Sequence, residues 1–264
     1  MKPREFINKY LLGGRTRLVK GTPKADIARF LSGVFPISTE HPLIRIGGNS
    51  DGGYLVPDDL VDTRTCFSPG VSNSSRFEEA LASRGIRSFM ADYSVEGPPA
   101  ENPLFYFEKK YLGSRNDEIF MTLQSWVERN APGENDMILQ MDIEGAEYPV
   151  LLSTPPEVLK RFRIIIIEFH GLDTLAEKRG LELIDLTFEK LLADFDVVHT
   201  HVNNCAKIIS HAGFELPPVM EFTFHRKDRS QSRKPTLRFP HPLDQACIPD
   251  QHDIRLPSCW HASP

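Results

Sequence analysis

The sequence has few of the residues that would place it in several protein classes. Its 264 residues include only four cysteines, and none of them forms a CxxC pair. This spacing indicates reduced thiols rather than a disulfide framework or a zinc site. The longest aliphatic run, residues 164–167, is far too short to cross a bilayer, and the first residues lack the apolar core of a signal peptide. We therefore expect a soluble, cytoplasmic protein with no membrane span.

An excess of positive charge is also absent. Lys and Arg number 31 against 36 Asp and Glu, which gives a net charge of −5 and argues against a general nucleic-acid binder. Basic residues gather only in residues 226–234, which we interpret as a solvated loop, with a site for a phosphorylated substrate as the alternative.

No linker rich in Ser, Gly and Pro and no internal repeat divides the chain. Its length is ample for one α/β domain with a real core. We expect an N-terminal helical lid or packing segment at residues 1–40, formed by two short helices. Residues 41–264 would form one domain whose C-terminal tail, rich in proline, runs over the surface.

The pattern of apolar residues predicts alternating strands and helices. Residues 43–57 have the alternation and the Gly/Asn/Asp turn of a β-hairpin. Helices are expected at residues 74–82 and 172–193, and a further helix is expected to end at about residue 130. Strands are expected at residues 65–67, 86–91, 105–112, 138–142, 163–169, 195–204 and 219–225.

This order predicts an α/β fold with a doubly wound, mostly parallel, Rossmann-like sheet. The last strand has an antiparallel β pattern. It fits a class I methyltransferase sheet, in which that strand inserts between the fifth and sixth.

Two features at strand ends are typical of a nucleotide site. The turn at residues 68–73 is built from small residues, among them Gly70 and Ser72, and the following strand ends at Asp92. An acidic residue about 20 positions after such a turn accepts ribose hydroxyls in nucleotide-binding folds. The turn is not a full G-x-G-x-x-G, which disfavours a dinucleotide.

Asp142 ends the apolar strand 138–142, and the carboxyl ends of strands are where open α/β sheets bind ligands. Capping of the next helix is the alternative. Further acidic and imidazole groups are expected on the same rim of the sheet. They are Glu168, His170, His199, His201 and Glu221.

Mixed oxygen and nitrogen ligands of this kind suit a divalent cation. We predict that Asp142, Glu168 and His201 bind Mg²⁺ or Mn²⁺, with His170 or His199 as a nearby base. An equal alternative is that these groups only hydrogen-bond each other and that one histidine alone is the base. Glu147 is expected to stabilise a helix N-terminus, whereas Glu144 is assigned to the site.

Several of these blocks, in order, resemble the FkbM-like family of S-adenosylmethionine-dependent methyltransferases. Residues 140–147 are similar to its hallmark K-x-D-x-E-G-x-E, and residues 166–169 to its following strand. The chain also resembles a narrower subgroup of this family, which carries blocks similar to residues 45–48, 51–54, 199–204 and 239–244. The resemblance spans residues 43–256. Gln140 departs from the family's lysine, and the turn at residues 68–72 is poorer in glycine than usual.

The resemblance implies S-adenosylmethionine as the cofactor. Asp92 would bind the ribose, Gly70 and Ser72 the nucleoside and methionine portions, Arg45 or Asp51 the amino or carboxylate group, and Asp117 the adenine. It also implies O-methylation of a small polar acceptor, a sugar hydroxyl of a nucleotide sugar, glycan or glycosylated natural product. Alternatives are methylation of a non-sugar natural-product hydroxyl, and a non-catalytic binding module with the same fold.

Overall fold

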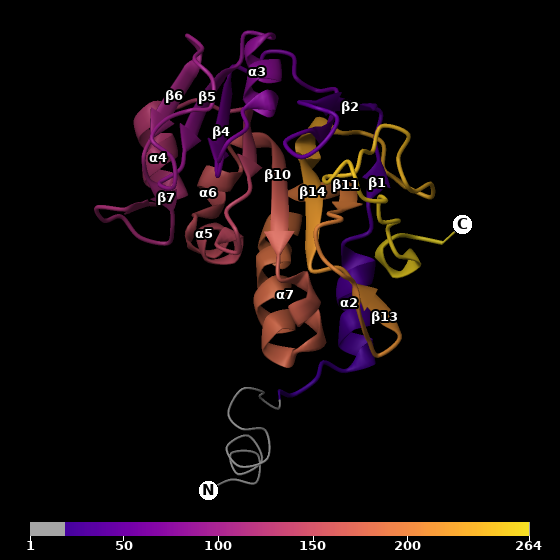
Figure 1. The fold of residues 1–264 in the computed structure, drawn as a ribbon. Coiled ribbons are helices and arrows are strands. Elements are labelled where there is room, and N and C mark those ends of the chain that lie inside the picture. Colours follow the sequence, from indigo (N-terminus) through magenta and orange to yellow (C-terminus); the bar gives the residue numbers. More distant parts are fainter. Residues whose placement is uncertain (1–18, 264) are drawn as a thin grey trace, which may run out of the picture.

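A seven-stranded sheet forms the centre of the protein (Figure 1). The computed structural model describes residues 19–263, so the first of the two helices expected near the N-terminus lies outside the described residues. In spatial order, the strands are β11 (Phe195–Val202), β14 (Val219–Arg226), β10 (Phe162–His170), β9 (Met137–Met141), β4 (Thr65–Pro69), β5 (Arg87–Ala91) and β6 (Phe105–Glu108).

The strand order confirms the predicted topology. Strands β10, β9, β4, β5 and β6 are parallel to one another, and β14 pairs antiparallel with both β10 and β11. Strand β14 comes last in the sequence among the strands of this sheet, and it lies between the fifth, β10, and the sixth, β11. Every residue of β9 is buried, as are all but the last of β10, which explains why both read as continuous apolar runs.

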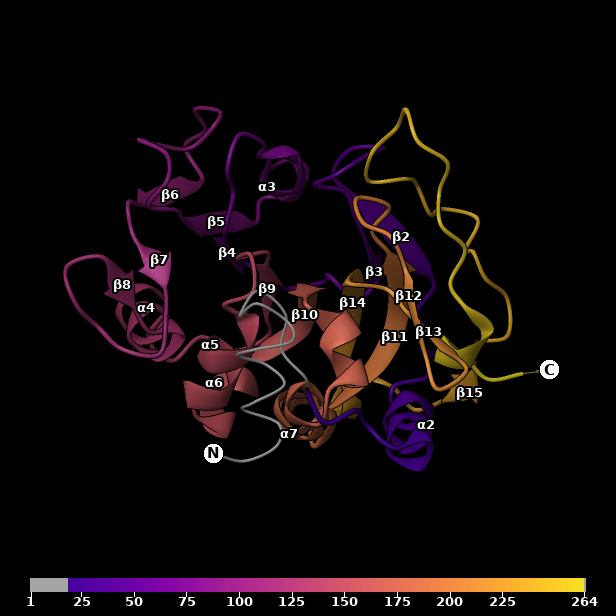
Figure 2. The same cartoon turned by 60° about the horizontal axis from the view of Figure 1, so that its bottom comes forward.

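Helices cover one face of this sheet, and a helix with a hairpin covers the other (Figure 2). The first face packs against one large apolar core that includes Phe30, Trp126 and Phe188, and the second against a smaller core around Phe77. The first face carries α2 (Lys24–Gly33), α4 (Leu123–Asn130), α5 (Glu147–Ser153), α6 (Pro156–Leu159) and α7 (Lys178–Leu192). The second carries α3 (Arg76–Ala82) and the hairpin of β2 (Leu43–Ile46) and β3 (Tyr54–Pro57).

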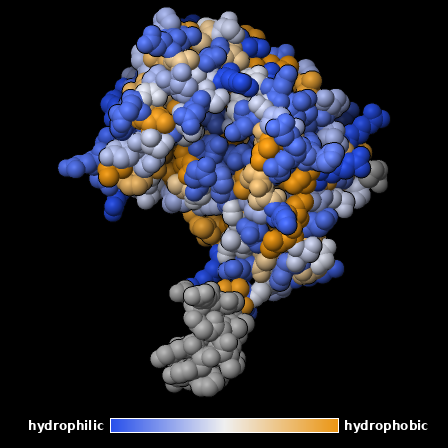
Figure 3. Space-filling view, in the orientation of Figure 1, coloured by the Kyte–Doolittle hydropathy of each residue, from blue (hydrophilic) through white to orange (hydrophobic). Residues whose placement is uncertain are grey.

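Short elements connect these layers. They are the strand pairs β1 (Ile37–Ser38) with β15 (Lys234–Pro235), β7 (Tyr111–Leu112) with β8 (Phe120–Met121), and β12 (Ile209–His211) with β13 (Phe214–Leu216), and the 3₁₀ helices η2 (Leu172–Ala176), η3 (Lys227–Arg229) and η4 (Ser258–Trp260). None of the helices within residues 19–263 has the length and apolarity to cross a membrane. Hydrophilic residues predominate on the face drawn in Figure 3.

The structure corrects two element boundaries. The strand predicted at residues 105–112 is divided, because a tight turn from Glu108 to Lys110 separates β6 from β7. The helix predicted at residues 172–193 begins as the 3₁₀ helix η2 and restarts as α7 at Lys178. Glu177 between them is extended because it forms an antiparallel bridge with Gly21.

The two glycine pairs of the hairpin, at residues 47–48 and 52–53, allow its two arms to approach each other closely. A Cβ atom on Gly47 would lie 2.3 Å from the carbonyl oxygen of Gly52, and one on Gly53 would lie 2.0 Å from that of Gly48. Both positions therefore require glycine, since a side chain at either one would force the two arms of the loop apart.

The C-terminal tail is more firmly packed than its composition indicated. Trp260 is fully buried, stacks edge-on against Phe30 and Phe222, and donates its indole N–H to the carbonyl oxygen of Glu215. The tail therefore contributes to the core as well as to the surface.

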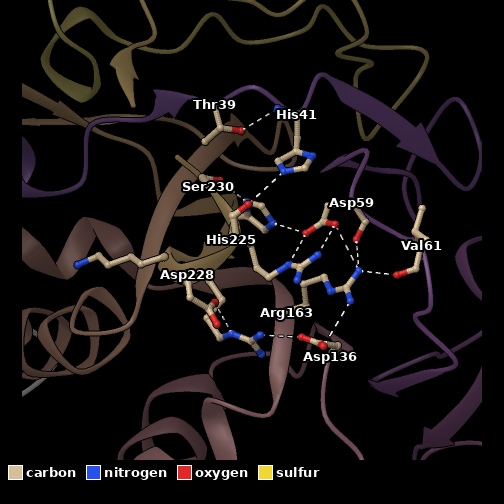
Figure 4. Close-up of polar contacts among 12 residues, drawn as sticks. Thr39, His41, Asp59, Val61, Asp136, Arg163, His225, Asp228 and Ser230 are labelled. Carbon is tan, nitrogen blue, oxygen red and sulfur yellow. Dashed lines mark hydrogen bonds and ion pairs between the residues drawn. The ribbon is translucent and has the colours of Figure 1, made fainter. Parts of the chain in front are cut away.

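A charged network closes the end of the sheet opposite to the carboxyl ends of the parallel strands (Figure 4). Asp59, at its centre, accepts hydrogen bonds from Arg163, Arg229 and His225. Arg163 also pairs with Asp136. His225 is only 1% exposed, because it faces this carboxylate.

Substitution Asp59→Asn should lower the free energy of unfolding by about 3 kcal/mol, because it removes the buried carboxylate that pairs with both Arg163 and Arg229. Chemical denaturation of the purified protein measures this. The matched control is Asp58→Asn, since Asp58 is exposed. Equal stability of the two variants would contradict a stabilising role for the network.

The same variants predict a difference in acid stability. Burial raises the pKa of Asp59, but its hydrogen bonds to Arg229 and His225 and the charge of Arg163 outweigh this and lower it from 3.8 to about 2. The stabilisation is therefore complete above the unfolded-state pKa and is lost as the pH falls from about 4 to about 2. In this window the stability of Asp59→Asn should fall less steeply than that of Asp58→Asn.

Candidate active site

The turns that follow β4 and β9 are pressed together at the carboxyl end of the sheet. The backbone N–H of Asp142 donates to the carbonyl oxygen of Pro69 over 3.3 Å. Gly70 has a φ of +88°, and a Cβ atom there would lie 1.5 Å from the carbonyl oxygen of Asp142. No other residue fits at position 70, so this glycine first serves the contact between the two turns.

Asp92 is held in place at the end of β5 by the turn after β4. Its Oδ2 accepts the backbone N–H of Ser72 at 2.9 Å, and its Oδ1 accepts the N–H and hydroxyl of Ser94. One lone pair of Oδ2 is left to accept a further donor. The buried carboxylate therefore has a fixed orientation and a free acceptor position.

A cavity of about 490 Å³ opens beside Asp92. One wall is apolar and aromatic, with Tyr111, Leu112, Phe120 and Ile143, and the other carries Asp51, Gly70, Ser72 and Asp142. A second cavity of about 320 Å³ shares Asp51, Gly70, Ser72 and Asp142 and extends towards Tyr54 and Glu78. The two cavities therefore adjoin at Asp142.

Asp142 does not cap the next helix. The cap position of α5 is Ala146, and the Oδ1 atom of Asp142 is buried without a hydrogen-bond partner. It lies 4.0 Å from Nε2 of His170, which in turn lies 3.5 Å from Oε1 of Glu168. One ligand atom from each of the three residues falls within 4.8 Å of the others. We call these three residues the rim triad.

Glu147 fixes the orientation of His170, a role that the sequence did not indicate. This carboxylate is fully buried, and its Oε1 accepts the N–H groups of Ile143 and Gly145 and contacts Nδ1 of His170 at 3.2 Å. The Nε2 atom of His170 thereby faces the other two members of the rim triad, Asp142 and Glu168. Glu144, in contrast, is 87% exposed, although its Oε2 lies 3.5 Å from the same Nε2.

The carboxylates of the rim destabilise each other's charge. Burial raises the pKa of Asp142, which nearby His170 only partly offsets. Burial and the charges of Asp142 and Glu221 raise the pKa of Glu168. Burial lowers the pKa of His170, but the hydrogen bond to Glu147 and the surrounding carboxylates outweigh it and raise it. A bound cation would relieve this accumulation of negative charge.

The structure separates the two histidines of β11 from the rim triad. His201 is grouped with Glu221 and Cys247, so the predicted ligand set of Asp142, Glu168 and His201 is not brought together. Position 170 supplies the imidazole instead, because β10 extends to His170 beside β9. His199 lies 2.9 Å from Asp244 and lines a different cavity together with His41, so it is not placed as a base for the triad.

The remaining predicted cofactor residues differ in their surroundings. Asp51 lines both cavities. Arg45 instead donates to the carbonyl oxygens of Gly48 and Ser50 within its own hairpin. Asp117 accepts the N–H groups of Ile119 and Phe120 in an exposed turn, outside the residues that line the cavity. The side chains of Arg45 and Asp117 are thus both engaged in hydrogen bonds with the backbone.

The sheet order, with one antiparallel late strand, is that of the class I methyltransferase fold, and a cavity lies at the carboxyl ends of its first strands. The sequence profile of the methyltransferase FkbM domain matches residues 70–214, more than half of the chain. The chain therefore belongs to the FkbM methyltransferase family, and it is an S-adenosylmethionine-dependent methyltransferase.

A comparison with solved structures finds similar chains that share little sequence with this one. A chain of the fibrillarin/Nop5p complex is 8% identical, with 62% of this chain and 72% of that chain covered and a TM-score of 0.38. A TehB-like S-adenosylmethionine-dependent methyltransferase from Corynebacterium glutamicum is 10% identical, with 83% and 94% covered and a TM-score of 0.30. No curated protein matches the sequence.

A pair of matched variants tests the cofactor cavity. Asp92→Asn should weaken S-adenosylmethionine binding about tenfold or more, since a hydrogen bond to a charged group contributes about 1.5–3 kcal/mol. Asp117→Asn should leave binding unchanged, because Asp117 lies outside the cavity. Calorimetric titration measures both. A larger loss in Asp117→Asn than in Asp92→Asn would place the cofactor elsewhere.

Proposed function

We propose that this methyltransferase O-methylates a hydroxyl group of a sugar, as part of a nucleotide sugar, a glycan or a glycosylated natural product. One observation carries the proposal. Asp142 both lines the cavity that contains Asp92 and belongs to the rim triad. A methyl donor in the cavity would thus lie next to carboxylate and imidazole groups that can bind and deprotonate a hydroxyl.

The cavity suits S-adenosylmethionine. The free acceptor position of Asp92 fits a ribose hydroxyl, and the wall of Tyr111, Phe120 and Leu112 offers aromatic and apolar surface to the adenine. The adjoining cavity beside Asp51 has room for the methionine portion. When bound, the cofactor supplies an electrophilic methyl group on a sulfonium, and the protein must align the acceptor oxygen with it.

The rim triad is the part of the site that would activate the acceptor. A hydroxyl oxygen is a better nucleophile once its proton is removed, and a group that accepts the proton must lie within hydrogen-bond reach. Asp142 has an unpartnered buried oxygen, which satisfies this requirement. Glu168 is tied to Asn203 through both of its oxygens, and His170 to Glu147, so these two would position the acceptor.

The triad also fits a divalent cation. Two carboxylates and one imidazole are ligands that Mn²⁺ accepts, and Mg²⁺ accepts the carboxylates. The unpartnered oxygen of Asp142 and the crowded negative charge favour such a cation. A cation held by Asp142, Glu168 and His170 would lower the pKa of the acceptor hydroxyl.

The polar character of the rim supports a hydroxyl-rich acceptor over an apolar one, since carboxylates and imidazoles pair with hydroxyl groups. Incubation with radiolabelled S-adenosylmethionine and matched panels of nucleotide sugars, oligosaccharides and hydroxylated aromatic compounds tests this. Label should appear on saccharides. Methylation of the aromatic panel alone would refute the sugar assignment, and binding without transfer to any acceptor would favour a non-catalytic module.

Substitution Asp142→Asn should reduce turnover on the acceptor found in this way by at least about 100-fold, because the variant cannot accept a proton. Its affinity for S-adenosylmethionine, measured by calorimetry, should change by less than about twofold, since Asp92 and the aromatic wall are intact. The control variant is Glu182→Gln, which alters an exposed carboxylate of α7 outside both cavities and should keep most of the activity. A fully active Asp142→Asn would return Asp142 to a structural role.

Removal of metal distinguishes the two ways of activating the hydroxyl. Treatment with EDTA followed by dialysis should abolish turnover, and added Mn²⁺ or Mg²⁺ should restore it, because the cation would stabilise the deprotonated hydroxyl. S-adenosylmethionine binding should survive the treatment. Activity that is unchanged after dialysis would leave proton transfer to Asp142 as the mechanism.

A further inference from the structure

A second group of metal-ligating side chains lies outside the rim triad. It consists of His201 on β11, Glu221 on β14 and Cys247 in the C-terminal tail, and one ligand atom from each lies within 4.8 Å of the others. None of the three exposes more than 7% of its surface. Residues from three separate segments thus bring an imidazole, a carboxylate and a thiol together in the interior.

The distances within this group are close to those of a tetrahedral zinc site. Nδ1 of His201 lies 3.8 Å from Oε2 of Glu221, and Sγ of Cys247 lies 3.4 Å from Oε1 of the same carboxylate. Zinc–ligand bonds of about 2.0–2.3 Å at tetrahedral angles place nitrogen and oxygen ligands about 3.4 Å apart, and sulfur and oxygen ligands about 3.6 Å apart. The three side chains would therefore provide three of the four ligands of such a site, with the fourth position open to water.

The outer partner of His201 also fits a metal ligand. Its Nε2 contacts the carboxylate of Asp253 at 3.1 and 3.3 Å, while Nδ1 faces Glu221. A histidine that binds a metal through one nitrogen usually donates the other N–H to a carboxylate, which fixes the ring and its tautomer. Asp253 occupies that position.

The combination of ligands selects a different ion from the one that suits the rim triad. Thiolate and imidazole favour Zn²⁺, whereas Mg²⁺ prefers oxygen ligands. Burial raises the pKa of the Cys247 thiol and that of the Glu221 carboxyl, and a cation bound between the two groups would oppose this effect. Zn²⁺ would stabilise both anionic forms.

We propose that His201, Glu221 and Cys247 bind one Zn²⁺ ion, and that this ion fastens the C-terminal tail across β11 and β14 beside the rim triad. Other contacts of the tail lie on either side of the group. Asn204 exchanges hydrogen bonds with the backbone of Ile248, and Asp244 pairs with His199. A zinc ion between them would link the tail to β11 and β14 through coordinate bonds, next to Glu168 on β10.

Cobalt substitution tests the site in the unaltered full-length protein. The protein is freed of metal with a chelator and loaded with Co²⁺, which adopts the tetrahedral geometry of Zn²⁺. We expect a thiolate-to-cobalt charge-transfer absorption in the near ultraviolet that added Zn²⁺ abolishes. Oxygen and nitrogen ligands alone do not give this absorption, so cobalt bound at the rim triad does not interfere. Its absence would overturn the proposal and leave a hydrogen-bonded cluster of thiol, carboxylate and imidazole.

Two cysteine variants assign the signal. Cys247→Ser should lose the absorption and the content of about one Zn²⁺ per chain that mass spectrometry should find in the wild type. Cys205→Ser, which alters an exposed thiol, should keep both. Circular dichroism establishes that each variant is folded. Equal zinc content and equal absorption in the two variants would also overturn the proposal, whether or not the protein methylates sugars.

Discussion

The site depends on keeping three carboxylates together at the buried rim of the sheet. The register of the antiparallel strands places Glu221 directly opposite Glu168, and the parallel neighbour β9 brings Asp142 to the same end. Like charges at this spacing repel one another, and burial removes the water that would screen them. His170, His201 and Asn203 offset this repulsion with positive charge and hydrogen bonds. The arrangement costs stability, which indicates that the rim is retained for function.

The opposite end of the sheet has a network of paired charges. There Arg163 and Arg229 neutralise Asp59, and Arg226 pairs with Asp136, so that each of these two carboxylates has a cationic partner. The basic residues that the sequence suggested were a solvated loop thus take part in fastening β10 and β14. The charges at this end are balanced and stabilise the fold, whereas the rim at the other end, where we propose the active site, has more carboxylates than cationic partners.

Much of the fold was predictable because its signals are local. The buried isoleucines of β10 and the strand, turn and helix around Asp142 are read from neighbouring residues, and they led to the confirmed sheet order. The break at Glu177 was not predictable, because it depends on a bridge to Gly21, more than a hundred residues away. The grouping of His201 with Cys247 likewise requires the path of a tail that has no periodicity.

Individual roles at the site were harder to predict than its location. Charged residue types alone do not show whether a side chain faces a ligand or satisfies its own backbone, as Arg45 and Asp117 do here. Glu147 has the sequence signature of a helix start, and only the approach of β10 brings it to His170. In contrast, the spacing of Asp92 from a small-residue turn predicted its place at the end of a strand, and the structure has it lining the cavity. Its contact with a ribose stays a prediction.

We propose that the donor and acceptor halves of the site meet at Asp142. A crystal structure with S-adenosylhomocysteine and Mn²⁺, with anomalous scattering recorded for manganese, would show this meeting point. We expect the ribose on Asp92, the sulfur facing Asp142, and an anomalous peak between Asp142, Glu168 and His170. A cofactor bound away from Asp92, or one whose sulfur faces away from the rim triad, would contradict it.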